Sequence, residues 1–140
     1  MDEYDKAGKA YYEAYKGINV KENEKIVLEC KTTWCYDFAA SIPDADIKAH
    51  EKVILELKNP NCSFYFAKDI PGADIKAHEQ VILEFKNKIF SFYFARDFPG
   101  ANIEEHFKVI YNSGNKYYFN LFIKYVNYKN TRVKEWLLYI

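Results

Sequence analysis

The sequence has little of several residue types, and each scarcity excludes a class of protein. Only three of its 140 residues are cysteine, and Cys30, Cys35 and Cys62 lack the paired spacing of a zinc site. An odd number of cysteines is not a disulfide framework either, so we expect reduced thiols in a cytoplasmic protein. Glycine is also scarce, and the sequence contains no Gly-x-Ser-x-Gly motif and no glycine-rich phosphate loop.

Long hydrophobic runs are missing as well. The longest are only a few residues, such as residues 53–55 and 121–123, although 49% of the chain is hydrophobic. No such run could span a bilayer, and the acidic first residues do not resemble a signal peptide. The sequence therefore predicts a folded protein that has no membrane partner.

The chain has no net charge, but its charges are unevenly placed. Residues 1–106 carry 14 Lys and Arg against 19 Asp and Glu, whereas residues 107–140 carry six basic residues against Glu135 alone. Binding along the phosphates of duplex DNA needs a continuous basic surface, which the acidic first part opposes. We therefore expect that free duplex DNA is not a partner.

The most prominent feature that the sequence does contain is a repeat with a period of 28 residues. The segment at residues 46–56 returns at residues 74–84 with one difference. The same interval separates His50, His78 and His106, and also Phe38, Phe66, Phe94 and Phe122. A fixed period of this size is typical of a repeat protein, in which one supersecondary unit stacks on the next.

Within one copy, residues 42–69, the pattern predicts two helices that form a hairpin. Asp46 is a good N-cap, and the apolar residues after it follow intervals of three and four over about three turns. Asn59 followed by Pro60 predicts the start of a second helix, which runs to about residue 68. Each repeat is therefore expected to be a helical hairpin.

The other copies extend this pattern to an all-α fold, a short α-solenoid of stacked helical hairpins with about nine or ten helices. We expect one repeat domain over residues 1–140, with atypical capping helices at both ends. Its predicted segments are an N-terminal capping helix at 1–17, repeats at 18–41, 42–69, 70–97 and 98–128, and a C-terminal capping helix at 129–140.

The unequal copies give further local predictions. Asn19 with Glu22 three residues later is the pattern of a capping box. Gly114 is expected to end one helix in a left-handed conformation, and Asn115 to cap the next helix at residues 116–128.

A family resemblance is carried by Phe66 to Ile82, which read Phe-Ala-Lys-Asp-Ile-Pro-Gly-Ala-Asp-Ile-Lys-Ala-His-Glu-Gln-Val-Ile. This segment resembles a tandem helical repeat found in many uncharacterised proteins of low-GC bacteria and their phages, over about residues 18–126. The resemblance implies a helical-repeat architecture with no shared catalytic residues. The basic, aromatic C-terminal part of this chain departs from that pattern.

The three histidines raise the question of a metal site. Zinc needs three or four ligands at one point, whereas equivalent residues of neighbouring repeats lie roughly 10 Å apart. We therefore expect the histidines to pack at the edge of the inter-repeat core, with no metal and no cofactor. Glu51 and Glu79 follow two of them, but adjacent residues on a helix do not face each other, so no acid–base pair is predicted. These points favour a protein that is not an enzyme and has no small-molecule substrate.

Aromatic residues give a larger signal. Others fall outside the period of the repeated phenylalanines, including Tyr12, Tyr36, Phe64, Phe92, Tyr118 and Tyr128. Exposed aromatics are usual anchors of protein interfaces, but short helices with wide apolar faces also use them for packing. Both roles stay open from the sequence.

Basic and aromatic residues interleave near the C-terminal end, where we predict the partner-binding site. Its residues are Lys116, Tyr118, Lys124, Tyr128, Lys129, Arg132 and Lys134. A basic patch steers association with an acidic partner, so we expect another protein or a ribonucleoprotein. Such a module suits an inhibitor or adaptor from a phage or mobile element that acts on a bacterial complex, for example a defence nuclease. The alternative is a nucleic-acid-binding protein that stacks single-stranded bases on the same residues.

Overall fold

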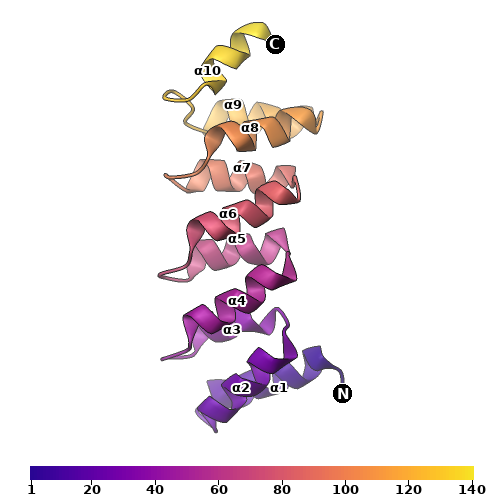
Figure 1. Ribbon diagram of the computed structural model, residues 1–140, viewed down its shortest axis with the longest axis vertical. Coiled ribbons are helices and arrows are strands. Elements are labelled where there is room, and N and C mark those ends of the chain that lie inside the picture. Colours follow the sequence, from indigo (N-terminus) through magenta and orange to yellow (C-terminus); the bar gives the residue numbers. More distant parts are fainter. The chain divides into compact units, whose positions relative to one another are not determined.

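A computed structural model describes residues 1–140 and consists of helices and connecting turns (Figure 1). Its ten α-helices confirm the predicted all-α class and the expected number of helices. The chain divides into two compact units, Met1–His78 and Glu79–Ile140. No helix combines the length and the apolar content that crossing a bilayer would require.

The first unit contains five helices and the start of a sixth. They are α1 (Glu3–Tyr15), α2 (Val20–Cys30), α3 (Trp34–Ser41), α4 (Ile47–Leu57), α5 (Pro60–Asp69) and α6 (Ile75–Glu84). The pairs α2–α3 and α4–α5 are hairpins, and α1 packs against α2 and α3. A Cβ atom at Gly8 would lie 3.0 Å from the Trp34 indole, so this glycine lets α3 approach α1 closely. The core of this unit includes Val27, Phe38, Ile54 and Phe66, all fully buried.

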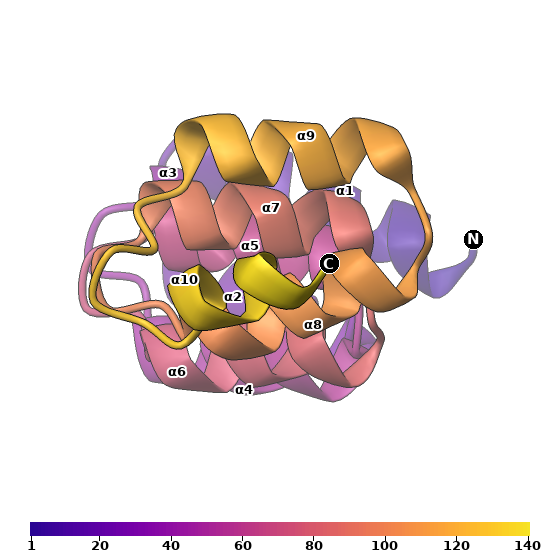
Figure 2. The ribbon, with the colours of Figure 1, turned by 90° about the horizontal axis from the view of Figure 1, so that it is seen from above.

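The second unit contains the rest of α6 and the remaining helices. They are α7 (Lys88–Asp97), α8 (Ile103–Asn112), α9 (Lys116–Tyr125), α10 (Val133–Trp136) and the short 3₁₀ helix η1 (Leu137–Tyr139). Figure 2 shows α7 beside α9, and α10 lies against α8. Phe92, Ile110, Phe122 and Val133 are buried in the core between these helices.

Most of the predicted helix caps are confirmed. The Asp46 carboxylate accepts a hydrogen bond from the Ala49 amide at 3.2 Å. The Asn59 side chain accepts from the amides two and three residues later, at 3.0 and 3.3 Å, with Pro60 at the first helical position. Asn115 caps α9, and Gly114 before it has a φ of 70°.

Three local predictions are wrong. Asn19 has a left-handed backbone (φ 45°) and forms no side-chain capping bond, because an N-cap side chain reaches the first-turn amides from an extended backbone. The helix after Asn115 ends at Tyr125, since Val126 is extended and buried. Residues 129–140 do not form one capping helix and contain only α10 and η1. The Thr131 hydroxyl stabilises a turn before α10, because it donates to the Tyr128 carbonyl and accepts from the Val133 amide.

The six aromatic residues named above differ in their exposure. Phe64 and Phe92 are each 2% exposed, so the interface role is wrong for them. The reason is the width of the buried face of α5 and of α7, which includes positions on both sides of the repeated phenylalanine. Tyr12 is 56% exposed, and Tyr36, Tyr118 and Tyr128 are half-buried.

Candidate functional site

The predicted partner-binding residues lie on α9, on the loop after it and beside or on α10. The basic side chains are all exposed, whereas the two tyrosines are half-buried. Lys124, Tyr128 and Lys129 line one hollow of about 400 Å³, together with Tyr125, which is 53% exposed. Lys116 lines a different hollow of about 270 Å³. The structure thus brings three of the seven residues together and places Lys116 apart from them.

Several of these side chains pack within the second unit. The Tyr118 ring lies 6.2 Å from the ring of Phe92, and burial raises the pKa of Tyr118. The Tyr128 ring stacks on Phe122 with 6.3 Å between centroids. The Arg132 guanidinium lies 5.6 Å from the centre of the Trp136 ring. The lysines and Tyr125 are exposed, and Lys124 lies 5.2 Å from the centre of the Tyr125 ring. The sequence analysis did not include Tyr125 in the site.

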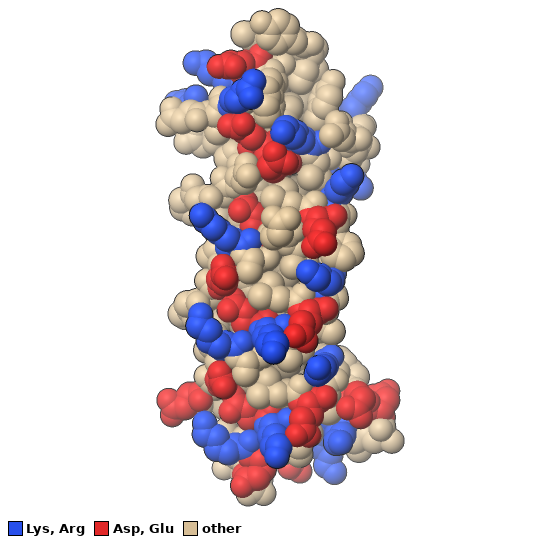
Figure 3. All heavy atoms as spheres, in the orientation of Figure 1, with Lys and Arg blue, Asp and Glu red and all other residues tan.

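The surface charges are mixed in both units. On the face shown in Figure 3, acidic and basic side chains alternate over each unit. Neither unit shows a broad basic area on that face. The basic side chains near α9 and α10 are thus a local feature.

A second arrangement, which the sequence analysis did not predict, connects successive repeats. Three buried histidines each pair through Nε2 with Oε2 of a glutamate from the preceding repeat. The pairs are His50–Glu24 (3.0 Å) and His78–Glu51 (2.9 Å) in the first unit, and His106–Glu79 (2.8 Å) in the second. All three imidazoles are 0% exposed. We refer to these pairs as the Glu–His joints.

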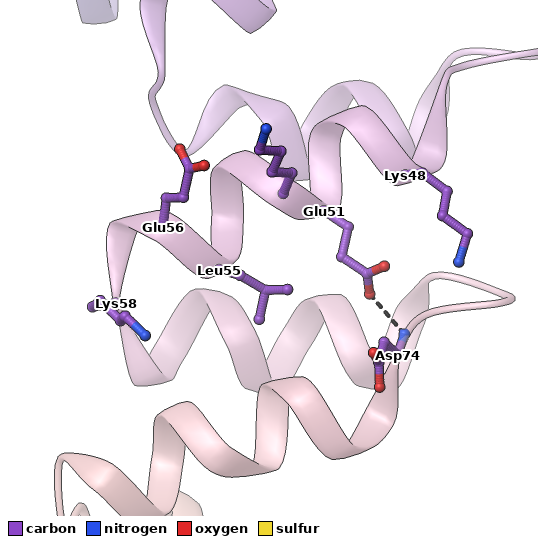
Figure 4. Close-up of a pocket in the computed structure, with 7 residues that line it drawn as sticks. Lys48, Glu51, Leu55, Glu56, Lys58 and Asp74 are labelled. Atoms are coloured by element: carbon purple, nitrogen blue, oxygen red, sulfur yellow. Dashed lines mark hydrogen bonds between the residues drawn. The ribbon is translucent and has the colours of Figure 1, made fainter.

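The same glutamate oxygen also accepts a backbone amide at the start of the next helix. In Figure 4, Glu51 points toward the amide of Asp74, which donates to it at 2.7 Å. The other two glutamates accept equivalent amides, Asp46 to Glu24 at 2.8 Å and Asn102 to Glu79 at 2.7 Å. A helix N-terminus has free amides, and these carboxylates replace the local glutamate of a capping box. Because each oxygen already accepts an amide proton, we assign the histidine nitrogen as the donor.

The other side of each imidazole is apolar. The histidine rings stack on the repeated phenylalanines, with centroid distances of 4.9 Å for Phe38–His50, 5.2 Å for Phe66–His78 and 5.5 Å for Phe94–His106. Their Nδ1 atoms are buried and have no hydrogen-bond partner in the protein. Protonation would put a second N–H where nothing accepts it. Burial accordingly lowers the pKa of His50 and of His78, against the opposing effect of the glutamates.

At each end of the series of Glu–His joints, a different residue replaces the histidine or the glutamate. Asn23 stands at the histidine position of α2 and donates to the Ile18 carbonyl at 2.9 Å, with Glu13 3.4 Å away. Phe107 stands at the glutamate position of α8 and packs 5.5 Å from Phe122. At each end, the substituted residue therefore has a partner of its own kind: Asn23 has a polar partner, and Phe107 has an apolar one. The sequence signal was the spacing of 26 or 27 residues from each glutamate to its histidine.

The buried polar groups offer no obvious chemistry to a substrate. The imidazoles have no access to solvent, and burial raises the pKa of the Cys35 thiol to about 12. The thiol is therefore protonated and unreactive near neutral pH. No three His, Cys, Asp or Glu side chains come together as metal ligands would. Comparisons of the chain with protein-family models, curated proteins and solved structures gave no match.

Proposed function

We propose that the protein is a non-enzymatic, protein-binding module built as a short α-solenoid with capping helices at its ends. The sequence period supports the solenoid, and so does the presence of the same Glu–His joint in both units. Stacked repeats create extended surfaces that suit binding to other macromolecules. The three buried histidines are each engaged with a glutamate, which supports a role outside catalysis.

The observation that carries this proposal is a group of exposed lysines in the second unit, one of which, Lys124, lies 5.2 Å from the ring centre of the exposed Tyr125. Lys124 and Lys129 line the hollow beside Tyr125, and Lys134 is exposed on α10. Lysines at the rim of an interface steer an acidic partner, while an aromatic side chain supplies the buried contact. The proposed partner is an acidic protein surface or a ribonucleoprotein, for example a bacterial complex that the module inhibits or bridges.

The test reverses the three lysines together. Lys124, Lys129 and Lys134 are changed to glutamate, and Arg132 is kept because its side chain packs on Trp136. The matched control changes three other lysines, Lys6, Lys9 and Lys68, to glutamate. Lys68 is included because it occupies the same place in the last turn of α5 that Lys124 occupies in α9. Both variants alter the net charge by the same amount.

We expect the control to capture the same partner from host-cell extract as the wild type, with similar yield. The reversed variant should lose that partner while its melting temperature stays close to that of the control. Equal capture by both variants would contradict the proposed face. Tight, salt-sensitive binding of the purified protein to duplex DNA would favour the nucleic-acid alternative.

A further inference from the structure

The second helix of the last hairpin, α9, has one side without a helix beside it. In the second unit, α9 packs against α7 and α8, whereas α10 contacts α8. Seen from above in Figure 2, α10 lies over α8, and no helix covers α9. Other second helices do have such a neighbour, since α7 contacts α9 and, in the first unit, α3 contacts α5. The uncovered side of α9 is thus the place that a further second helix of the series would occupy.

The residues on this side are roughly opposite the contact with α7. Tyr118 faces α7, where the centre of its ring lies 6.2 Å from that of Phe92. Lys116, Asn120 and Ile123 follow at intervals of four and three residues on the other side of the helix. The first two are exposed, and the isoleucine is half-buried. We call the side formed by these three residues the open side of α9.

The central position of the open side is aromatic in the preceding hairpins. Asn120 is one period after Phe92, whose ring contacts α9. It is three periods after Tyr36, whose hydroxyl donates to the Asp69 carboxylate of α5 at 2.6 Å. Both earlier residues thus contact the next second helix of their own unit. The exposed amide of Asn120 can donate and accept a hydrogen bond, so it suits a contact with a polar group of another molecule.

A hollow lies at each end of the open side, and α9 lines each with an apolar residue and a lysine. Lys116 and Phe119 line the hollow of about 270 Å³. Ile123 and Lys124 line the hollow of about 400 Å³. No side chain in either lining is acidic. The two lysines are eight positions apart, which is roughly 12 Å along a helix.

The acidic residues of the second unit lie elsewhere or are already paired. Residues 106–134 contain none. Glu105 pairs with a lysine of α8 at 3.0 Å, and Asp97 of α7 with the arginine before it at 2.6 Å. The Glu104 carboxylate accepts a backbone amide from the segment before α10 at 3.3 Å. Glu135 is exposed, but it lies on α10, which contacts α8. Charge complementarity therefore favours an acidic occupant of the open side.

We propose that the open side of α9 receives an amphipathic, acidic helix of the partner protein, packed where a further second helix would stand. This inference rests on the proposed function and gives the chemistry of that partner. The apolar residues of the partner helix pack on Phe119 and Ile123. Two of its carboxylates, seven or eight positions apart, meet Lys116 and Lys124. A polar residue between them pairs with Asn120 and fixes the register, as a single asparagine does in coiled coils.

The experiment places photo-reactive benzoylphenylalanine at position 120 of the full chain, adds the purified protein to host-cell extract and irradiates the mixture. An aromatic side chain suits this position, since Phe64 and Phe92 occupy it in earlier repeats. Mass spectrometry is expected to identify a cross-linked segment of another protein that has an apolar stripe and acidic residues seven or eight positions apart. The same photo-reactive residue at position 6, on α1, should not cross-link that segment.

The identified segment is then synthesised as a peptide and titrated into the purified protein. The peptide should bind and gain the circular dichroism of a helix. Lys116→Glu with Lys124→Glu should abolish this binding. Lys6→Glu with Lys9→Glu makes the same change in charge on α1 and should bind the peptide as the wild type does. Thermal melts of both variants check that they are folded.

Several results would overturn the inference. A cross-link from position 120 to nucleic acid, to a second copy of this chain or to a segment without that acidic spacing is one. Absence of a cross-link in a protein that still captures the partner is another. The proposed function fails by a different result, which is equal capture by the protein reversed at Lys124, Lys129 and Lys134 and by its control. If the wild type captures no partner, both fail.

Discussion

At the scale of single residues, the Glu–His joint explains how similar helices find their correct neighbours. Apolar faces of nearly identical helices could pack in more than one register. The joint adds a directional requirement, because one carboxylate oxygen must meet both an imidazole nitrogen and an amide of the next helix. A buried polar group left without its partner costs roughly 1–3 kcal/mol, so an incorrect register is disfavoured.

The joints predict a specific dependence of stability on pH. The pKa values of His50 and His78 lie below their usual value of 6.5 in the folded protein. Below that value the unfolded chain binds more protons than the folded one, so stability falls with decreasing pH. The limiting slope is about 1.4 kcal/mol per pH unit for each histidine. The melting temperature should therefore drop between about pH 7.5 and about pH 5.5.

The matched control for this prediction is the double variant His50→Gln with His78→Gln. Glutamine keeps an N–H donor near the position of Nε2 but does not titrate in this range. Its melting temperature should vary less with pH than that of the wild type over the same interval. An equal pH dependence of both proteins would show that other groups are responsible.

At the scale of helices, the two asparagines that precede helices have different roles. Asn59 accepts two amide protons at the start of α5, so Asn59→Ala should lower the free energy of unfolding by about 1 kcal/mol. Asn19 makes no capping bond and lies at φ 45°, a conformation that glycine adopts without strain. Asn19→Gly should therefore leave stability unchanged or raise it slightly. Urea unfolding of the two variants measures both effects, and a loss at Asn19 as large as that at Asn59 would contradict this assignment.

The helices themselves could be predicted from the sequence because their signals are local. Asp46, Asn59 and Asn115 precede apolar residues at helical spacing, and each caps a helix. The end of α9 could not be predicted in this way, since Val126 leaves the helix to be buried in the core. The sequence left the burial of Phe64 open for a similar reason, because the width of a buried face depends on neighbouring helices.

The Glu–His joints were missed although the sequence contained their signal. Glu51 was compared with the histidine beside it on the same helix, which it cannot face. Its partner is His78, one repeat later, and the same interval relates Glu79 to His106. A repeat protein forms many of its contacts between neighbouring copies, so pairs separated by nearly one period, here 26 or 27 residues, were the informative comparison.

At the scale of the whole molecule, the central claim is a division of roles between buried and exposed polar residues. The buried glutamates and histidines connect successive repeats, and the exposed lysines are the residues proposed to bind a partner. Glu51→Ala should remove two buried hydrogen bonds and lower the free energy of unfolding by roughly 2–4 kcal/mol. The same change should leave the surface of the second unit intact.

The most direct test is to measure partner capture by the Glu51→Ala protein at a temperature where circular dichroism shows that it is folded. The division of roles predicts that this variant melts earlier than the wild type but captures the same amount of partner. Loss of capture by the folded variant, with capture retained by the protein reversed at Lys124, Lys129 and Lys134, would contradict it. That result would place the function at the Glu–His joint.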